Sequence, residues 1–191
     1  MSGLSSPPIP PVSFERAMVF VDGSNVLINI RESGLKIPSF YNLGALTVGS
    51  RQLTRVYVYT SQEKLDAAKQ FHGQDCFSGC RVVLGDSVPL ENGGHREKGV
   101  DALLVADLVY HAAMKNFQYA VVISNDSDFA VALKRVEDFG CRTGLVSVIK
   151  KAPQRLIEAC DDFTFFTGEQ LWEKMSPASS NPSFESTRRS D

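Results

Sequence analysis

The sequence lacks any long hydrophobic run and any strong excess of one charge. No apolar stretch approaches the roughly 18 residues of a transmembrane helix, and the first residues lack the basic and apolar regions of a secretory signal. We therefore expect a soluble protein of the cytoplasm without a membrane partner. The formal net charge of −2 gives no sign of a nucleic-acid-binding surface in the charge of the whole chain.

Cysteine and histidine are also scarce. The chain of 191 residues has four cysteines and three histidines, which fits free thiols in a reducing compartment. His72, Cys76 and Cys80 follow one another at intervals of four residues, a spacing that a zinc site can use. Gly79 would interrupt a helix there and a fourth ligand is not evident, so ordinary packing is the favoured interpretation.

Three regions differ in composition. Residues 1–14 are rich in proline and serine, and residues 176–191 are mostly polar, so we expect a disordered arm and a disordered tail. Residues 15–175 contain enough apolar side chains for one sizeable core, which predicts a single folded domain. Basic residues exceed acidic ones between Lys134 and Arg155, and this excess fits either a polyanion-binding face or a solvated helix face.

Strand and helix patterns alternate along this domain. Short apolar runs predict strands over residues 17–21, 56–59, 81–84, 118–124 and 142–148, with a short addition over 163–166. Helices are expected over residues 25–32, 43–52, 62–73, 100–114, 127–139 and 153–160, and a polar loop over 85–99. Such βαβ units predict a three-layer α/β fold whose mostly parallel sheet has about five strands in the order 3-2-1-4-5.

Acidic residues follow two of these strands. Asp22 comes directly after the first strand, and Asp126 and Asp128 come directly after the fourth. In the expected order these strands are neighbours where the winding reverses, and ligands of open α/β sheets bind at the carboxyl ends of strands there. Asp101, in the first turn of the helix before the fourth strand, is expected at the same rim. Carboxylates gathered in this way repel one another unless a cation lies between them.

These acids predict a site for Mg²⁺ or Mn²⁺. Hard oxygen ligands without nearby histidine or cysteine suit these ions, which keep several waters and bind phosphates. Each acid also has an ordinary structural interpretation. Asp22 could shape an Asp-Gly turn, and Asp101, Asp126 and Asp128 could cap helices or place charge in a first turn. The convergence of three separate chain segments favours the metal site over these separate interpretations.

Three polar residues beside the acids are candidates for binding a substrate. Ser24 and Asn25 follow Asp22, and Ser127 follows Asp126. The Asn25 amide suits a water, a phosphate or a 2′-hydroxyl group. Asn25 could equally be the N-cap of the first helix, and both roles can hold at once.

The polar loop before Asp101 carries further candidates. His95, Arg96 and Lys98 could neutralise substrate phosphates there, or the loop could be only a solvated, hairpin-like excursion. Asp107 lies six residues after Asp101, which places it about 120° around the helix and about 9 Å along its axis. It therefore cannot share one ligand position with Asp101, and we expect it to support the site from beneath.

Taken together, the three segments resemble the NYN domain family, the PIN-like nuclease branch that includes LabA-like proteins. The matching segments are residues 19–25, 98–101 and 120–129, and Gly140 follows them. The family usually has glycine at the position of Asn125. Because asparagine tolerates positive φ, we expect the turn to survive, with added bulk near the metal.

The resemblance implies a PIN-like, Rossmannoid three-layer fold and divalent-metal-dependent cleavage of RNA. It implies that Asp22, Asp101 and Asp126 are metal-binding carboxylates. It also implies that Asn25 and Asp128 are further members of the site and that Asp107 is a supporting acid.

The leading hypothesis is therefore a ribonuclease in which a metal-bound water attacks the phosphodiester in line. A first alternative is an RNA-binding or protein-interaction module on the same fold, with weak or no catalysis. A second is a nucleotide or phosphate-ester hydrolase, which would need a closed cavity rather than a groove. No aromatic platform for stacking bases is evident, so the sequence predicts no base preference. It likewise does not decide whether the chain forms a homo-oligomer.

Overall fold

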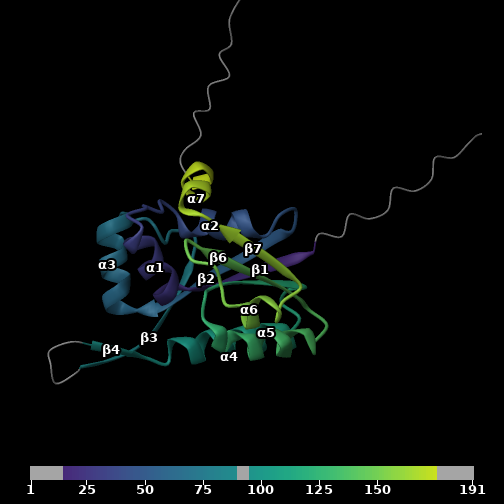
Figure 1. Ribbon diagram of the computed structural model, residues 1–191. Helices are drawn as coiled ribbons and strands as arrows, with labels where there is room; N and C mark the ends of the chain where they lie inside the picture. The colour runs from purple at the N-terminus through teal and green to yellow at the C-terminus, as the bar shows by residue number, and fades with distance from the viewer. Residues whose placement is uncertain (1–14, 90–94, 176–191) are drawn as a thin grey trace, which may run out of the picture.

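A central sheet of seven strands organises the computed structural model, which describes residues 15–89 and 95–175 (Figure 1). The strands are β1 (Arg16–Asp22), β2 (Gln52–Ser61), β3 (Arg81–Pro89), β4 (His95–Lys98), β5 (Tyr119–Ile123), β6 (Arg142–Val148) and β7 (Asp162–Phe166). Their order across the sheet is β4-β3-β2-β1-β5-β6-β7, and neighbouring strands are parallel except for the antiparallel pair of β3 and β4.

Helices cover both faces of this sheet. They are α1 (Gly23–Glu32), α2 (Phe40–Thr47), α3 (Gln62–His72), α4 (Val100–Ala113), α5 (Ala130–Glu137), α6 (Gln154–Ile157) and α7 (Gly168–Met175), with a 3₁₀ turn η1 (Ser127–Phe129) before α5. None of the helices within the described ranges combines the length and the apolar character that crossing a membrane requires.

The core has two halves because side chains of a strand alternate between the faces of the sheet. Val19 and Val21 of β1 pack with α1, α2, α3 and α7 on one face. Met18 and Phe20 pack with α4, α5 and α6 on the other (Figure 1). The central strands are apolar on both sides, as is typical of a parallel sheet covered by helices.

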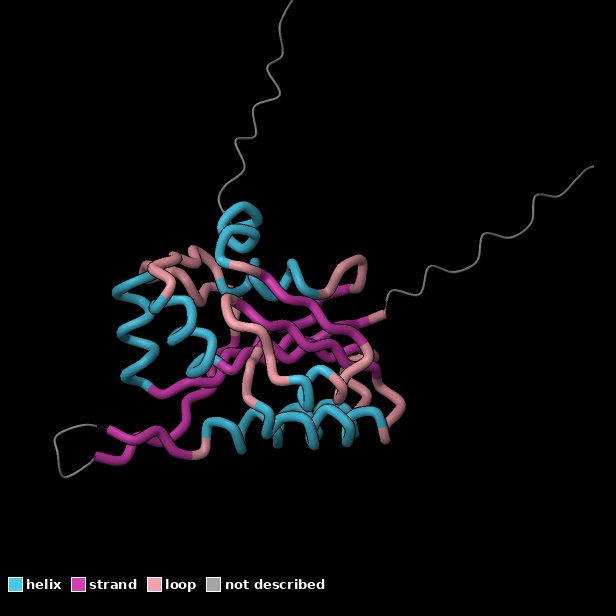
Figure 2. The backbone as a smooth tube through the Cα atoms, in the orientation of Figure 1, coloured by secondary structure: helices cyan, strands magenta, loops and turns pink. Residues whose placement is uncertain are grey.

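The predicted fold class is confirmed, and the predicted order 3-2-1-4-5 corresponds to β3-β2-β1-β5-β6. The count of about five strands is wrong, because β7 and β4 extend the sheet at its two edges. The expected loop over residues 85–99 is also wrong in part. There β3 continues to Pro89 and pairs with β4, so that the two form a ribbon extending from the sheet (Figure 2). This ribbon is mostly polar, and its sequence therefore shows no apolar pattern of a strand.

Some helix boundaries also differ from expectation. The helix expected over residues 43–52 is α2, which ends at Thr47, and its last expected residue instead begins β2. Ser39 caps α2, since its side chain accepts a hydrogen bond from the Asn42 backbone N–H. Helix α7 had no predicted counterpart. The expected arm over residues 1–14 and tail over 176–191 lie outside the described residues.

Gly23 allows α1 to begin directly where β1 ends. A Cβ atom at this position would lie 2.6 Å from the Tyr59 backbone oxygen of the neighbouring strand β2. Real Cβ atoms do not approach a carbonyl oxygen so closely. The close contact between the start of α1 and β2, which sets the position of Asp22, therefore requires glycine.

We expect Gly23→Ala to lower the free energy of unfolding by about 1–3 kcal/mol, because backbone must move to accept the methyl group. Gly168→Ala is the matched control, since its Cβ would make only an ordinary contact with the Ile149 side chain at 3.5 Å. Urea denaturation of both variants measures the difference. Equal stability of Gly23→Ala and the unmodified protein would contradict this account of the turn.

Candidate metal and nucleic-acid site

Asp22 is a buried carboxylate at the carboxyl end of β1, with 4% of its surface exposed. Its Oδ1 accepts a hydrogen bond from the Asn25 backbone N–H at 3.1 Å and so caps α1. Its Oδ2 accepts a hydrogen bond from the Ser124 hydroxyl at 2.6 Å. The N-cap of the first helix is therefore Asp22, and the alternative that assigned this role to Asn25 is wrong.

Ser124 joins the ends of the neighbouring strands β1 and β5. Besides donating to Asp22, its Oγ accepts a hydrogen bond from the Asp126 backbone N–H at 3.0 Å. Asp126 in turn caps η1, because its Oδ1 accepts from the Asp128 backbone N–H at 2.9 Å. The capping interpretation of Asp126 thus holds together with its position beside Asp22.

The acids at this edge influence one another. The pKa of Asp22 is raised to about 6. Burial is the largest cause, the hydrogen bonds from Ser124 and Asn25 oppose it, and the charges of Asp101 and Asp126 add smaller increases. The pKa of Asp101 is also raised, first by desolvation and then by the charges of Asp126 and other nearby acids. The carboxylates of Asp22, Asp101 and Asp126, from β1, the start of α4 and the turn after β5, therefore lie near enough for their charges to act on one another.

Glu97 of β4 is an additional acid at this edge that the sequence analysis missed. It accepts a hydrogen bond from the Ser24 hydroxyl at 2.6 Å and forms an ion pair with Lys64 of α3. Its charge also contributes to the raised pKa of Asp101, whereas the charge of Lys64 lowers it. Alternation along β4 could have indicated Glu97, but only if the pairing of β4 with β3 had been known.

The other predicted substrate-binding residues have different surroundings. Lys98 is exposed beside Asp86, on the opposite side of the ribbon from Glu97, because successive side chains of a strand point to opposite faces. His95 and Arg96 belong to β4, but their side chains lie outside what the structure describes. Ser127 begins η1 and is half-buried.

Two asparagines connect α1 to the turn after β5. Asn25 Oδ1 accepts hydrogen bonds from the Asn29 side chain at 3.1 Å and from the Asn125 backbone N–H at 3.3 Å. Asn125 is not among the described residues with positive φ, so the turn does not depend on glycine at this position. Its Oδ1 is buried without a hydrogen-bond partner among the described groups, so an unsatisfied acceptor lies in the residue directly before Asp126.

Asp107 faces the sheet rather than the other acids. Its Oδ2 accepts a hydrogen bond from the Tyr59 hydroxyl at 2.9 Å. Burial and the charge of Asp107 raise the pKa of Tyr59 well above its usual range, so this hydroxyl stays protonated as a donor. This contact ties α4, which carries Asp101 in its first turn, to β2.

The residues of the possible zinc site have packing roles. His72 Nδ1 accepts a hydrogen bond from the Ile37 backbone N–H at 3.1 Å, and burial lowers the pKa of His72 to about 4. Its ring packs edge-on against Phe40, while Cys76 lies in the core. Within residues 15–89 and 95–175, these side chains do not form a group suited to a metal ion.

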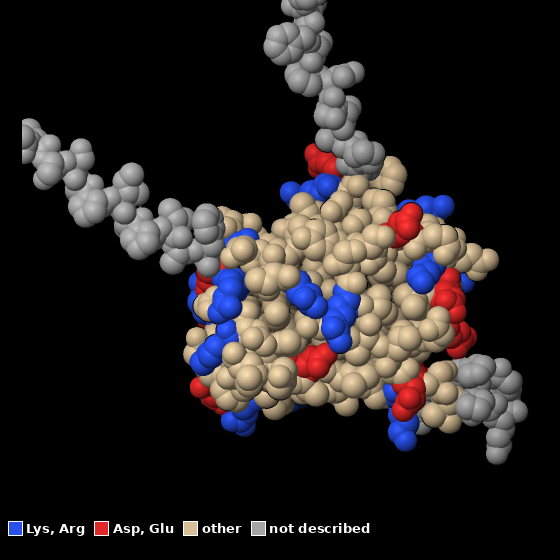
Figure 3. All heavy atoms as spheres, turned by 180° about the vertical axis from the view of Figure 1, so that it is seen from behind, with Lys and Arg blue, Asp and Glu red and all other residues tan. Residues whose placement is uncertain are grey.

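The basic excess from Lys134 to Arg155 is partly neutralised. Arg135 pairs with Asp138, Arg142 with Asp162 and Lys150 with Glu32, at distances of 2.6, 3.2 and 2.7 Å. On the face seen from behind, basic groups lie at several separate places, and acidic groups lie near many of them (Figure 3). These pairs favour a solvated surface over a dedicated polyanion site.

We call the region of Asp22, Glu97, Asp101 and Asp126 the acidic edge. Its possible metal ligands are all oxygen atoms. In the described ranges, no three His, Cys, Asp or Glu side chains are grouped so that together they could hold a metal ion, so the expectation that Asp22, Asp101 and Asp126 all bind one ion is not met. Mg²⁺ is commonly held by only one or two carboxylates and keeps several waters, so it does not need such a group. Among the described side chains, no lysine or arginine forms an ion pair with Asp22, Asp101 or Asp126. Carboxylates that repel one another and lack a basic partner among the described side chains fit a hydrated divalent ion held by one or two of them.

Comparison with known proteins identifies relatives at the level of family and fold. The NYN domain profile matches residues 16–171. The chain is 33% identical over 57 residues to the uncharacterized protein y4oD of Sinorhizobium fredii, a match that covers 30% of this chain and only 27% of that protein. It also resembles the crystal structure of VPA0982, a protein of unknown function from Vibrio parahaemolyticus. That comparison has a TM-score of 0.65 and 19% identity, over 83% of this chain and 96% of the other, and shows the fold alone.

The raised pKa of Asp22 predicts that ionising this side chain lowers the stability of the folded protein. The folded protein holds this proton up to about pH 6, whereas the unfolded chain releases it near pH 3.8. Stability is therefore lost as the pH rises through this window, and Asp22→Asn, which carries no charge, should escape the loss. In EDTA, the free energy of unfolding of Asp22→Asn should rise relative to that of the unmodified protein as the pH increases from 4 to 7, by up to about 3 kcal/mol.

Urea denaturation at several pH values measures this gain. Asp75→Asn, an exposed position in the loop after α3, is the matched control and should show no such trend. A stability difference between Asp22→Asn and the unmodified protein that does not change with pH would contradict the buried-charge account.

Proposed function

This chain belongs to the NYN domain family of the PIN-like nuclease superfamily, and from this premise we propose that it is a divalent-metal-dependent ribonuclease. One observation carries the proposal most directly. Ser124 links Asp22 and the Asp126 turn at the carboxyl ends of adjacent parallel strands, with Asp101 close enough to raise the pKa of Asp22. The substrate would be RNA, and the cofactor Mg²⁺ or Mn²⁺.

The acidic residues would have different roles in binding the ion. Asp101 and Asp126 would hold the ion most directly, because both oxygens of Asp22 already accept hydrogen bonds from the protein. Asp22, buried at the end of β1, would add negative charge near the ion. Through Ser124 it would also hold the turn that carries Asp126. When bound, the ion supplies acidity to water and positive charge against the phosphate. Asp128 is exposed beside this position and Lys64 adds a nearby cation for the substrate.

A binding module with weak or no catalysis is the second candidate, and a specific observation favours it. Asp22 and Asp126 each cap a helix or turn, which is a sufficient structural reason for both carboxylates. Under this alternative the same edge would hold RNA or a protein without cleaving a bond.

Cleavage of labelled RNA tests the first proposal. With Mn²⁺ or Mg²⁺ we expect phosphodiester hydrolysis, and EDTA should abolish it. Asp126→Asn should reduce the rate at least 100-fold, because the amide carries no charge to hold the ion. Asp75→Asn should retain the activity of the unmodified protein.

The outcomes separate the candidates. Cleavage that survives both EDTA and Asp126→Asn would remove the metal-dependent mechanism. RNA binding without cleavage, over a broad pool of RNA and DNA substrates, would instead favour the binding module.

Metal binding has a readout that does not depend on activity. A ligand that binds only the folded state raises the unfolding temperature, and at 100 times its Kd it adds about 2.7 kcal/mol. We expect millimolar Mn²⁺ to raise the unfolding temperature of the unmodified protein and of Asp75→Asn, but much less that of Asp101→Asn. An equal rise in all three proteins would show that the ion binds elsewhere.

A further inference from the structure

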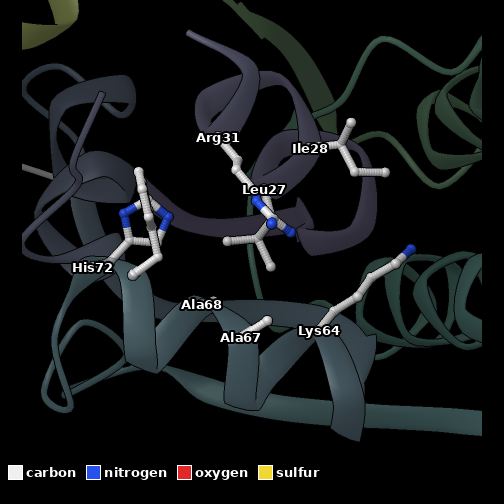
Figure 4. Close-up of a pocket in the computed structure, with 8 residues that line it drawn as sticks. Leu27, Ile28, Arg31, Lys64, Ala67, Ala68 and His72 are labelled. Atoms are coloured by element: carbon white, nitrogen blue, oxygen red, sulfur yellow. The ribbon is translucent and has the colours of Figure 1, made fainter. Parts of the chain in front are cut away.

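A hollow of about 70 Å³ lies between α1 and α3 (Figure 4). Its walls are apolar, formed by Leu27 and Ile28 of α1 and by Phe71 of α3. The small side chains of Ala67 and Ala68 leave room between the two helices. The hollow is partly open to solvent.

The hollow lies between two helices that start at the edge of the sheet that carries the candidate metal site. Helix α1 follows Asp22 directly, and α3 follows the carboxyl end of β2, so both helices start at the same edge of the sheet. Lys64, in the first turn of α3, lines the hollow and pairs with Glu97. Arg31 lines it further along, nine residues after Asp22 and about 14 Å along the helix axis.

The charges around the hollow suit a polyanion. In Figure 4 the Arg31 side chain extends from α1 over Leu27, and Lys64 extends from α3. Arg31 is exposed and forms no ion pair with the described side chains. His72, which also lines the hollow, has its pKa lowered to about 4 by burial and is neutral near pH 7. The hollow therefore combines an apolar floor with two cations spaced along it.

We infer that this hollow binds a nucleotide of single-stranded RNA next to the scissile phosphate. The base rests on the apolar walls, and the flanking phosphates contact Lys64 and Arg31. Contacts between bases and apolar or aromatic side chains tolerate any sequence, and they require bases that are not stacked within a duplex. For RNA as the ligand class this inference rests on the proposed function, but it does not require that the RNA be cleaved.

Lys64 has a particular part in this arrangement. Its present partner Glu97 is also held by the Ser24 hydroxyl, so Glu97 keeps a hydrogen-bond donor if the ammonium turns to a phosphate. A phosphate at Lys64 would lie where the hollow meets Glu97 of the β3–β4 ribbon. The ion pair thus places a cation where the RNA backbone passes from the hollow to the acids.

Fluorescence anisotropy with a labelled, mixed-sequence 12-nucleotide RNA in EDTA tests the inference without cleavage. Ile28→Asp puts a charge on a wall residue that is 47% exposed, and Arg31→Gln removes the unpaired cation. We expect each to weaken binding about tenfold. Arg31→Gln should also reduce the slope of log Kd against log salt concentration by about 0.7, the value for one phosphate contact on a single strand.

Matched controls lie away from the hollow. Val131→Asp introduces the same charge on α5, on the opposite face of the sheet, at a residue that is 62% exposed. Arg55→Gln removes an exposed arginine from β2. Both should bind RNA within twofold of the unmodified protein, and thermal unfolding verifies that all four variants are folded.

Photo-cross-linking of the unmodified protein to RNA that contains 4-thiouridine provides a measurement without variants. Cross-links on residues 23–32 or 62–72 would support the inference, and cross-links confined to other segments would overturn it.

The two proposals fail in different ways. If Ile28→Asp and Arg31→Gln both bind RNA more weakly but the unmodified protein cleaves no RNA, RNA binding in the hollow is supported and the ribonuclease proposal is rejected. If the unmodified protein cleaves RNA and neither variant changes cleavage or binding, RNA binding in the hollow is rejected and the ribonuclease proposal stands. An unmodified protein that binds no single-stranded RNA would overturn the inference.

Discussion

The hydrogen bond from Ser124 to Asp22 is the contact on which the acidic edge depends. It joins the ends of two adjacent parallel strands and satisfies a carboxylate that is almost wholly buried. The same serine oxygen accepts the Asp126 N–H, so the next acid is placed by the same group. Burying a carboxylate costs free energy when its hydrogen bonds replace only part of its lost hydration. Such groups are concentrated at functional sites of proteins.

The rest of the edge is assembled from segments that are far apart in the sequence. Gly23 lets α1 start against β2, and Glu97 ties the β3–β4 ribbon to Ser24 and to Lys64 of α3. Asp107 and Tyr59 hold α4, and with it the first turn that carries Asp101. At Asp126 the cap uses only Oδ1, so its other oxygen would serve the proposed cation, whereas both oxygens of Asp22 already accept hydrogen bonds.

The sequence predicted the central strands, their order and the meeting of Asp22 with Asp126, because parallel strands impose a simple rule on where their ends lie. It missed Glu97 and the position of Lys64. Both depend on the β3–β4 ribbon, whose polar side chains produce no periodic apolar signal, and on a pairing between residues more than 30 positions apart. The alternative that made Asn25 the N-cap is wrong for a related reason, since α1 begins at Gly23, in close contact with β2, and Asp22 is its N-cap.

By itself, the sequence determined which segments form the central strands and which acids follow them, and these patterns suffice for the fold class and for the family resemblance. Only the tertiary structure decided which carboxylate is buried, which lysine faces an acid, and that Phe71 and Ile28 line a hollow between α1 and α3. Those properties depend on packing and on the local loss of water, which arise between segments and have no pattern within any one of them.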